Sequence, residues 1–527
     1  MATTQPVDGD SAGTFLGHPK GLFVLFFAEM WERFSYYGMR ALLIFYLTKH
    51  WLFSDSDAGI IYGAYTALVY ITPVVGGYLA DKYLGQRKAV LFGAVLLTLG
   101  HFFMAFEGDP AAGTENNPIV YVFWLALALI IVGSGFLKAN ISVIVGQLYP
   151  RTDTRRDAAY TIFYMGINLG AAIGSLLCGY IGETYGWAYG FGLAGIGMLA
   201  GLVVFVWGKP LLLGRGEPPK QLAKKTEWSM YGVGIALVGI CWLAIQYQDM
   251  VGYVLGLFGG SLVLYVLFTA VVKLPSEERD RIFAAMFLIL TSIVFWALFE
   301  QAGSSLNLFT DRHVDRGGVP ASTFQSINAI YIILLAPVFA VTWQTLGRKG
   351  LEPSAPLKFG LGVVQVGLGF LVLVWGAQSV GMDAAVPVLF IFLIYLLHTT
   401  GELCLSPVGL SAMNRLAPSH MASLIMGTWF FASATGNFAA GLIASATGAE
   451  GVGEEAGKQV VLDVYSTVGW YAIAIGVGVM VISPLIKKLM HLDTLQDDDV
   501  GDDLLGQSEG PGEPQGAGMH PETRPLG

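Results

Sequence analysis

Residues 29–40 read Glu29-Met30-Trp31-Glu32-Arg33-Phe34-Ser35-Tyr36-Tyr37-Gly38-Met39-Arg40, and they place four charges inside an otherwise apolar stretch, 21–48, that is long enough to span a bilayer. A charged side chain at the bilayer centre costs about 2.5–3.5 kcal/mol on insertion scales, so these groups must face protein or water. Glu29, Arg33 and Tyr37 are spaced four apart, as are Glu32, Tyr36 and Arg40. This spacing places both rows on one face of a helix and predicts a polar path through a membrane protein.

The composition indicates an integral membrane protein. Of the 527 residues, 54% are hydrophobic and 13% are charged, whereas soluble domains carry about 25% charged residues. Much of the net charge of −9 lies in residues 490–527, which we expect to be a disordered acidic cytoplasmic tail, so the charge does not indicate a nucleic-acid partner. The three cysteines, Cys178, Cys241 and Cys404, lie in apolar segments without metal-ligand spacing, and we expect no metal or cofactor.

Fourteen stretches of about 20 residues are apolar enough to span a membrane. They lie at 21–48, 57–80, 89–106, 118–147, 158–180, 187–207, 228–247, 251–272, 282–310, 322–346, 358–380, 385–413, 420–445 and 464–486. The loops between them are alternately rich and poor in Lys and Arg, and positive charge marks the cytoplasmic side. We therefore expect a multi-pass protein of the plasma (inner) membrane with both termini in the cytoplasm.

The predicted spans divide into six, two and six. We expect a cytoplasmic N-terminal segment (1–20), an N-terminal six-helix bundle (21–208), a connector with a transmembrane helical hairpin (209–279) and a C-terminal six-helix bundle (280–489). The hairpin holds no charge within the membrane, so we expect it at the periphery. The fourth span of one bundle carries Lys138 and that of the other carries Glu402. Parallel repeats around a central site are typical of major facilitator transporters, so the predicted fold is an all-α membrane protein of that class with fourteen transmembrane helices.

Four motifs, in order along the chain, resemble those of the proton-coupled oligopeptide transporter (POT) family, whose bacterial members also carry the extra hairpin. They are Glu29-x-x-Glu32-Arg33-Phe34-x-Tyr36-Tyr37, Gly133-x-Gly135-x-x-Lys138, Phe163-Tyr164-Met165-Gly166-Ile167-Asn168-Leu169-Gly170 and Glu402-Leu403-Cys404-Leu405-Ser406-Pro407-x-Gly409. The resemblance extends to about Leu489. It implies a symporter, not an enzyme, that imports di- and tripeptides with protons by alternating access.

The depth of the charges separates a central site from an outer one. At 1.5 Å per residue from Lys20, Glu29 and Arg33 lie about 14–20 Å into the membrane, and Arg40 lies about 30 Å in. The mid-membrane charges comprise four acids and three bases: Glu29, Glu32, Glu300 and Glu402 against Arg33, Arg40 and Lys138. Pairing leaves one carboxylate over, and a buried carboxylate without a counter-charge tends to take up a proton. Because Arg stays charged, the proton carrier should be a Glu.

The resemblance implies roles for particular residues. The residues expected to take part in proton coupling are Glu29, Glu32, Arg33, Lys138 and Glu300. Arg33 and Lys138 would bind the peptide carboxylate, and Glu402 would bind the amine. Asn168 and Asn328 would bind the peptide backbone. The pocket walls would comprise Tyr36, Tyr37, Tyr70, Trp296, Ser406, Trp429 and Phe430. We expect protons as the coupling ion, no cofactor, and function as a monomer.

A second polar stripe is predicted on the span 282–310 and just beyond it, where Trp296, Glu300, Ser304, Asn307 and Asp311 share one helical face. Arg40 and Asp311 have opposite charges at similar estimated depth, and we predict that they form an outer gate pair, as the resemblance also implies. Gly77-Tyr78-Leu79-Ala80-Asp81-Lys82 and the following Gly85-x-Arg87-Lys88 resemble a loop motif of the wider superfamily and predict a conformational latch.

Other functions remain open from the sequence. The same fold also serves carriers of other small solutes such as nitrate, a sugar or a drug, although opposed charges at Lys138 and Glu402 argue against a simple anion site. A non-transporting membrane nutrient sensor is a further alternative. A membrane-embedded enzyme is disfavoured, because the sequence shows neither a metal-ligand cluster nor a Ser–His–Asp arrangement at matching depth.

Overall fold

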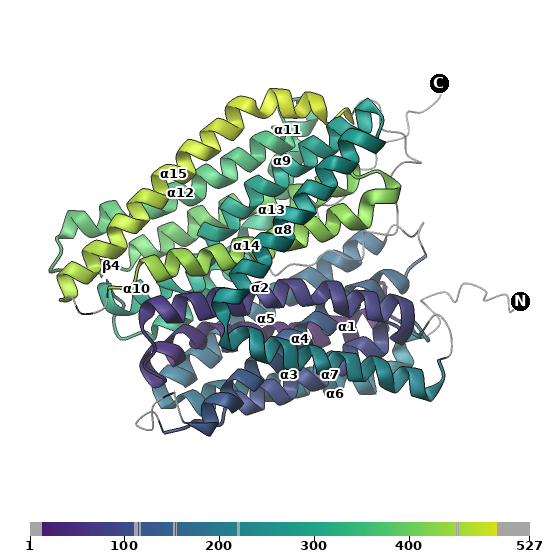
Figure 1. The fold of residues 1–527 in the computed structure, drawn as a ribbon, viewed down its shortest axis with the longest axis horizontal. Coiled ribbons are helices and arrows are strands. Elements are labelled where there is room, and N and C mark those ends of the chain that lie inside the picture. Colours follow the sequence, from purple (N-terminus) through teal and green to yellow (C-terminus); the bar gives the residue numbers. More distant parts are fainter. Residues whose placement is uncertain are drawn as a thin grey trace, which may run out of the picture.

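The computed structural model describes residues 13–492 apart from 110–113, 115–116, 151–152, 154, 219–221, 450 and 452. Nearly all of the predicted acidic tail, and most of the predicted N-terminal segment, lie outside the described residues. Within them the chain is almost wholly helical (Figure 1). Two short strand pairs, β1 (Thr14–Phe15) with β2 (His18–Pro19) and β3 (Val314–Asp315) with β4 (Val386–Pro387), lie at helix ends.

The long helices follow the six–two–six order predicted from the sequence. The N half holds α1 (Lys20–Phe45), α2 (Asp55–Leu79), α3 (Gln86–Met104), α4 (Pro118–Gln147), α5 (Arg155–Tyr185) and α6 (Trp187–Trp207). The hairpin is α7 (Lys224–Gln246) and α8 (Gln248–Lys273). The first of the six C-half spans consists of α9 (Ser276–Phe299) and the short α10 (Ser305–His313). The other five are α11 (Ser326–Arg348), α12 (Ala355–Val380), α13 (Leu389–Leu416), α14 (Ala422–Ala446) and α15 (Glu454–Leu489).

Twelve of the described helical segments are long and apolar enough to cross a membrane. The other two predicted spans are also helices: α1, which carries the charged residues, has 26 residues, and α14 has 25. Short irregular turns join or extend them: the π-helical turns η2 (Tyr46–His50) and η3 (Ala80–Leu84), and the 3₁₀ turns η5 (Lys209–Leu212), η6 (Glu300–Gly303), η7 (Ala321–Gln325) and η8 (Ser419–Met421). The predicted all-α membrane fold is confirmed.

Each half has its own apolar core, and the halves meet along two helix pairs. Figure 1 shows the N half in purple and blue below the C half in green and yellow. Helix α2 packs on α14, and α5 packs on α11. A Cβ atom on Gly63 of α2 would lie 2.6 Å from the Cα of Gly441 on α14. The two backbones can come this close only because both residues lack side chains, as is common where membrane helices cross.

The hairpin lies at the periphery, as predicted. Helix α7 packs on α4 and α2, whereas α8 packs on α9, α14 and α2. Most of the large apolar side chains of the hairpin point outward, including Tyr253, Leu257 and Phe268. Outward apolar side chains suit a lipid-facing surface.

The predicted span 282–310 falls within one membrane-crossing helical segment, Ser276–His313, which a short turn interrupts. Helix α9 ends at Phe299, the chain makes the 3₁₀ turn η6, and α10 then runs from Ser305. At the turn, the Tyr62 hydroxyl of α2 lies against Gly303, where any Cβ atom would overlap it. The prediction that five polar residues of this span share one face of a regular helix was therefore wrong, because the 3₁₀ turn changes the rise and rotation per residue. These residues are Trp296, Glu300, Ser304, Asn307 and Asp311.

The two ends of the helix bundle differ in their polar contacts. We name the end that carries Lys49 and Asp311 the Asp311 side, and the opposite end the Arg87 side. On the Arg87 side, Arg87 Nε and Nη2 donate to the Glu217 carboxylate at 2.6 and 3.2 Å, and the Arg87 N–H donates to the Gly216 carbonyl at 2.8 Å. These bonds hold the connector between the N half and the hairpin against the start of α3.

Candidate functional site

The charged segment of α1 forms a closed ionic cluster inside the N half. Glu29, Glu32 and Arg33 are all fully buried. The Arg33 Nε lies 2.6 Å from Glu29 Oε1 and 3.3 Å from Glu32 Oε2. One guanidinium thus pairs with two carboxylates of its own helix, one a turn earlier and one on the preceding residue, and such pairing is what a buried charge requires. The predicted inward orientation of this stripe is confirmed.

Lys138 of α4 lies beside this cluster but does not share its ion pairs. Its side chain is 3% exposed, and its Nζ lies 3.8 Å from the centroid of the Tyr36 ring. Among the residues that the structure describes, the ammonium has no hydrogen-bond partner. A cation over an aromatic face is partly stabilised, but its three N–H donors still favour an acceptor. Lys138 is therefore a buried cation suited to an incoming anion.

Glu402 lies in the C half and is positioned by a polar neighbour. It is 1% exposed on α13. The Asn328 amide of α11 donates to Glu402 Oε2 at 3.0 Å and to the Thr399 hydroxyl at 3.0 Å. The amide therefore bridges two helices and fixes the direction of the carboxylate. Of the predicted site residues, Asn328 and Glu402 are thus brought together by the fold.

A cavity of about 260 Å³ lies between the halves on the Arg87 side of Lys138. Its walls come from α2, α4 and α14, and they include Tyr70, Lys138 and Phe430 of the predicted site together with Asn140 and Met426. It extends to Asp81 of η3, the turn that follows α2. A mostly apolar pocket with a few polar groups is typical of a small-molecule site.

Other predicted pocket residues lie elsewhere. Tyr37 packs against a small cluster formed by Ala171 and Ala172 of α5 and Ala329 of α11, where the halves meet. Asn168 donates to the Tyr164 carbonyl of its own helix at 3.2 Å. In this structure Trp429 is 1% exposed and packs on Phe359 within the C half, rather than lining the cavity.

Trp296 and Ser406 are also buried in the C half, at 3% and 0% exposure. An aromatic residue on an apolar helix has the same sequence pattern whether it lines a pocket or fills a core. The sequence therefore offered no signal to separate Trp429 and Trp296 from Tyr70 and Phe430.

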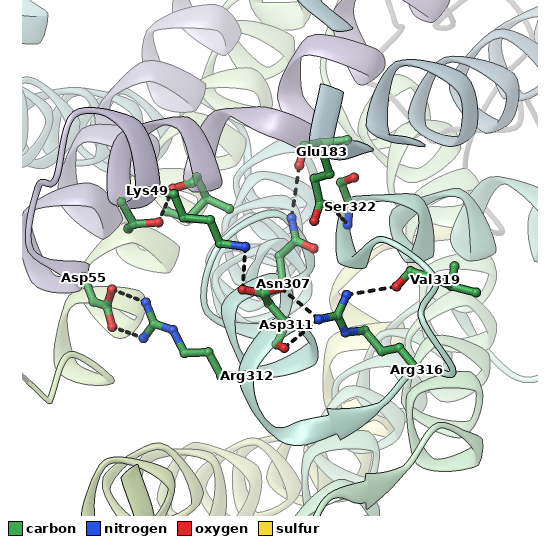
Figure 2. A network of polar contacts seen from close by, with 12 residues as sticks. Lys49, Asp55, Glu183, Asn307, Asp311, Arg312, Arg316, Val319 and Ser322 are labelled. Carbon is green, nitrogen blue, oxygen red and sulfur yellow. Dashed lines mark hydrogen bonds and ion pairs between the residues drawn. The ribbon is translucent and has the colours of Figure 1, made fainter. Parts of the chain in front are cut away.

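Ion pairs join the two halves on the Asp311 side. Deepest is Arg40 of α1, which pairs with Glu300 of η6, while its Nε donates to the Tyr62 hydroxyl at 2.6 Å. The Asn307 amide of α10 donates to the carbonyl of Ala41, the residue after Arg40, at 3.2 Å. The predicted pairing of Arg40 with Asp311 was wrong: Asp311 pairs with Lys49 at 2.7 Å and with Arg316 at 3.0 Å (Figure 2).

Further contacts between the halves on this side were missed from the sequence. Arg312 of α10 forms a two-bond pair with Asp55 of α2, and the Ser322 N–H donates to Glu183 of α5 at 2.7 Å (Figure 2). These charges sit at helix ends, where long polar side chains commonly reach solvent, so their sequence positions did not distinguish them. The network closes the Asp311 side in this structure.

Comparison with known proteins places this chain in a family. A family model described as the POT family matches residues 87–456. The protein belongs to the POT family. A peptide transporter of Yersinia enterocolitica, YePEPT, is 39% identical over 459 residues, covering 82% of this chain and 88% of the relative. The dipeptide and tripeptide permease B of Aliivibrio fischeri is 32% identical, covering 91% and 97%.

Solved structures of POT proteins share the fold at full length. A mutant of the peptide transporter POT, crystallised in complex with alafosfalin, is 37% identical to this chain and superposes with a TM-score of 0.78. The match covers 91% of this chain and 97% of that one. The family is one of multi-pass membrane transporters, which agrees with the non-enzyme prediction.

Proposed function

We propose that this POT-family protein is a proton-coupled symporter that imports di- and tripeptides across the plasma (inner) membrane by alternating access. The observation that carries the proposal is the opposition of two buried charges: Lys138 in the N half beside the cavity, and Glu402 in the C half. The names of the Yersinia and Aliivibrio relatives support it. Both halves lie in one chain, so the proposed unit is a monomer.

A short peptide matches this pair of charges chemically. It carries a carboxylate at one end and an ammonium at the other, and a dipeptide spans about 7 Å at ~3.3–3.6 Å per residue. Lys138, with Arg33 close behind it, would receive the carboxylate, and Glu402 would receive the amine. A peptide held at both ends links the N half to the C half, which gives a physical reason for closure of the halves around it.

The ionic cluster on α1 would couple this binding to protons. Arg33 remains charged at any physiological pH, so a proton must be carried by one of its partners, Glu29 or Glu32. Protonation of either carboxylate weakens its bond to Arg33 and leaves more cationic charge for the peptide carboxylate. Glu300 pairs with Arg40 between the halves. Its protonation would weaken that pair in the same way and so couple protons to opening of the Asp311 side.

The charge of the loops gives the proposed orientation. The Arg87 side carries the loops rich in Lys and Arg, and the positive-inside rule places it in the cytoplasm together with both termini. The closed Asp311 side then faces outward, and the cavity that runs from Lys138 to Asp81 lies on the inner side. On this proposal, the conformation described here is inward-facing.

The energy of the proton gradient is sufficient for uphill import. A membrane potential of about 100 mV contributes ~2.3 kcal/mol per charge, and one pH unit contributes ~1.4 kcal/mol. Their sum of ~3.7 kcal/mol sustains a concentration ratio of about 500 for one net charge moved.

The experiment that tests the proposal is uptake of labelled dialanine into proteoliposomes under an imposed inward pH gradient. We expect uptake above the external concentration, and its loss when a protonophore collapses the gradient. Absence of uptake by well-folded protein would contradict the peptide assignment. Uptake that is insensitive to the protonophore would retain the peptide and contradict the coupling.

A further inference from the structure

A second, larger cavity lies on the Asp311 side, away from the central site. Its volume is about 660 Å³, and it is formed wholly by the C half: the end of α10, the loop between α12 and α13, and the start of α15. The cavity is lined by two basic residues, Arg312 and Lys458, and by three acidic residues, Asp383, Glu454 and Glu455. Because all the described residues in its walls belong to the C half, the cavity can persist when the halves move apart.

A buried lysine holds the wall of this cavity in place. Lys458 is 2% exposed, and its ammonium donates to the carbonyls of Gly381, Met382 and Ala384 at 3.1, 3.3 and 2.7 Å. These three bonds use the full donor capacity of an ammonium group. The loop is thus tied to α15, and the cavity is preformed.

The mixture of charges restricts the ligand class. Among the described residues no group of three or more His, Cys, Asp or Glu side chains converges as a metal site requires. A lone anion would face Asp383, Glu454 and Glu455, and a lone cation would face Arg312 and Lys458. A ligand with a carboxylate and an ammonium satisfies both signs, and the volume is in the range of small-molecule pockets.

Arg312 connects the cavity to the gate. It lines the cavity and also forms the two-bond pair with Asp55 of the N half (Figure 2). The side chains are 42% and 19% exposed, and solvent-exposed ion pairs contribute little to stability. A ligand carboxylate can therefore compete with Asp55 for the guanidinium.

We propose that this cavity binds a small zwitterion, a free amino acid or a short peptide, and that binding releases one of the contacts that close the Asp311 side. Arg312 exchanges the Asp55 carboxylate for that of the ligand, and Asp383 or Glu454 accepts the ligand ammonium. The ligand binds more tightly when Arg312 has left Asp55, so it favours the conformation that is open on the Asp311 side. Opening in turn raises the affinity for the ligand by the same factor. The inference requires the halves to move but does not require that a peptide is transported.

The test measures opening by the distance between spin labels at Phe106→Cys and Leu389→Cys, two exposed positions on opposite halves. The background replaces the three buried cysteines by alanine and disables the central site with Lys138→Gln and Glu402→Gln. We expect millimolar alanine, and separately dialanine, to raise the population of the longer distance at least twofold. N-acetylalanine, which lacks the ammonium, should not.

The matched variants are Asp383→Asn and Glu454→Gln, singly and together, which alter exposed side chains and leave the pair of Arg312 with Asp55 intact. They should abolish the shift while the ligand-free distances stay unchanged. A response to alanine and dialanine alike assigns the site to the shared zwitterion, and a response to dialanine alone assigns it to peptides. No shift in the central-site background, or an equal shift in the cavity variants, would overturn the proposal, whatever the outcome of the uptake experiment.

Discussion

Arg40 of α1 pairs with Glu300 of η6, directly at the point where α9 ends. The pair joins the N half to the C half, and the Tyr62 hydroxyl accepts a further bond from Arg40. Arg40 is 7% exposed and Glu300 is 4% exposed, so each charge depends on the other for its solvation. The pair of Arg40 and Glu300 is therefore more deeply buried than the ion pairs that Lys49 and Arg312 form nearer the surface.

Replacing Glu300 by Gln should weaken the contact between the N half and the C half at this point. The change leaves the Arg40 charge buried without its carboxylate, and breaking a buried pair in this way typically costs about 3–5 kcal/mol. The conformation closed on the Asp311 side should lose most of that stability, and gradient-driven dialanine uptake should fall at least tenfold. Spin-label distances between Phe106→Cys and Leu389→Cys measure the opening. The charge-swapped variant Arg40→Glu with Glu300→Arg should recover closure in part; if it behaves like Glu300→Gln, the ion pair is not what closes this side.

Replacing Glu32 by Gln should separate coupling from binding. Arg33 keeps Glu29 at 2.6 Å, so the guanidinium remains neutralised and the helix should stay folded. Without one proton-accepting carboxylate, uptake driven by a pH gradient should be abolished, while counterflow exchange of dialanine at equal pH should continue. Loss of both activities in a variant that retains its elution volume would assign Glu32 to binding instead.

Much of this site could be predicted from the sequence because burying a charge in a membrane is costly. The four charges of residues 29–40 had to face the protein, and the spacing of Glu29 and Arg33 gave their contact directly. The opposition of Lys138 and Glu402 followed from the repeat of six spans. Such inferences need only helical geometry and the energetics of desolvation.

The partner of Arg40 could not be predicted in the same way. Matching Arg40 with Asp311 assumed a continuous helix with a rise of 1.5 Å per residue, whereas η6 interrupts the helix at Glu300. A 3₁₀ turn has a different rise and rotation per residue, so depth and facing direction both change beyond it. Tyr62, which lies against Gly303 at this turn, is on another helix, so this contact leaves no local signal at Glu300.

The connector should contribute a pH-dependent increment of stability through Glu217. Its bonds from Arg87 lower the pKa of the Glu217 carboxyl from the ordinary 4.5. A carboxyl whose folded pKa is depressed contributes stability that is fully present above its unfolded pKa and is lost as the pH falls through the lower, folded value. For a partly exposed pair this is about 0.2–1 kcal/mol.

Glu217→Gln should therefore lower the melting temperature slightly at pH 7 and have a smaller effect at pH 3. A double-mutant cycle with Arg87→Gln provides the control, because Glu217→Gln should have no further effect once its partner is gone. An undiminished effect at pH 3, or in the Arg87→Gln background, would show that Glu217 acts through some other contact.

Gly303→Ala tests whether the turn η6, which separates α9 from α10, depends on the close approach of Tyr62. The backbone of Gly303 does not need a positive φ, so alanine is conformationally acceptable and its effect is steric. The new methyl group would overlap the Tyr62 hydroxyl and lie 2.6 Å from Tyr62 Cζ. Overpacking of this kind costs about 1–3 kcal/mol, and displacing Tyr62 also removes its bond to Arg40.

We expect a lower melting temperature and a larger open population on the Asp311 side for Gly303→Ala. Adding Tyr62→Phe should restore closure only in part, because the ring carbon still lies too close. Gly256→Ala on α8 is the matched control: no atom lies within 4 Å of the added methyl group, and replacing a mid-helix glycine should be neutral or stabilising by about 0.5–1 kcal/mol. Equal destabilisation by both substitutions would show that glycine content, and not the contact with Tyr62, sets the stability of this turn.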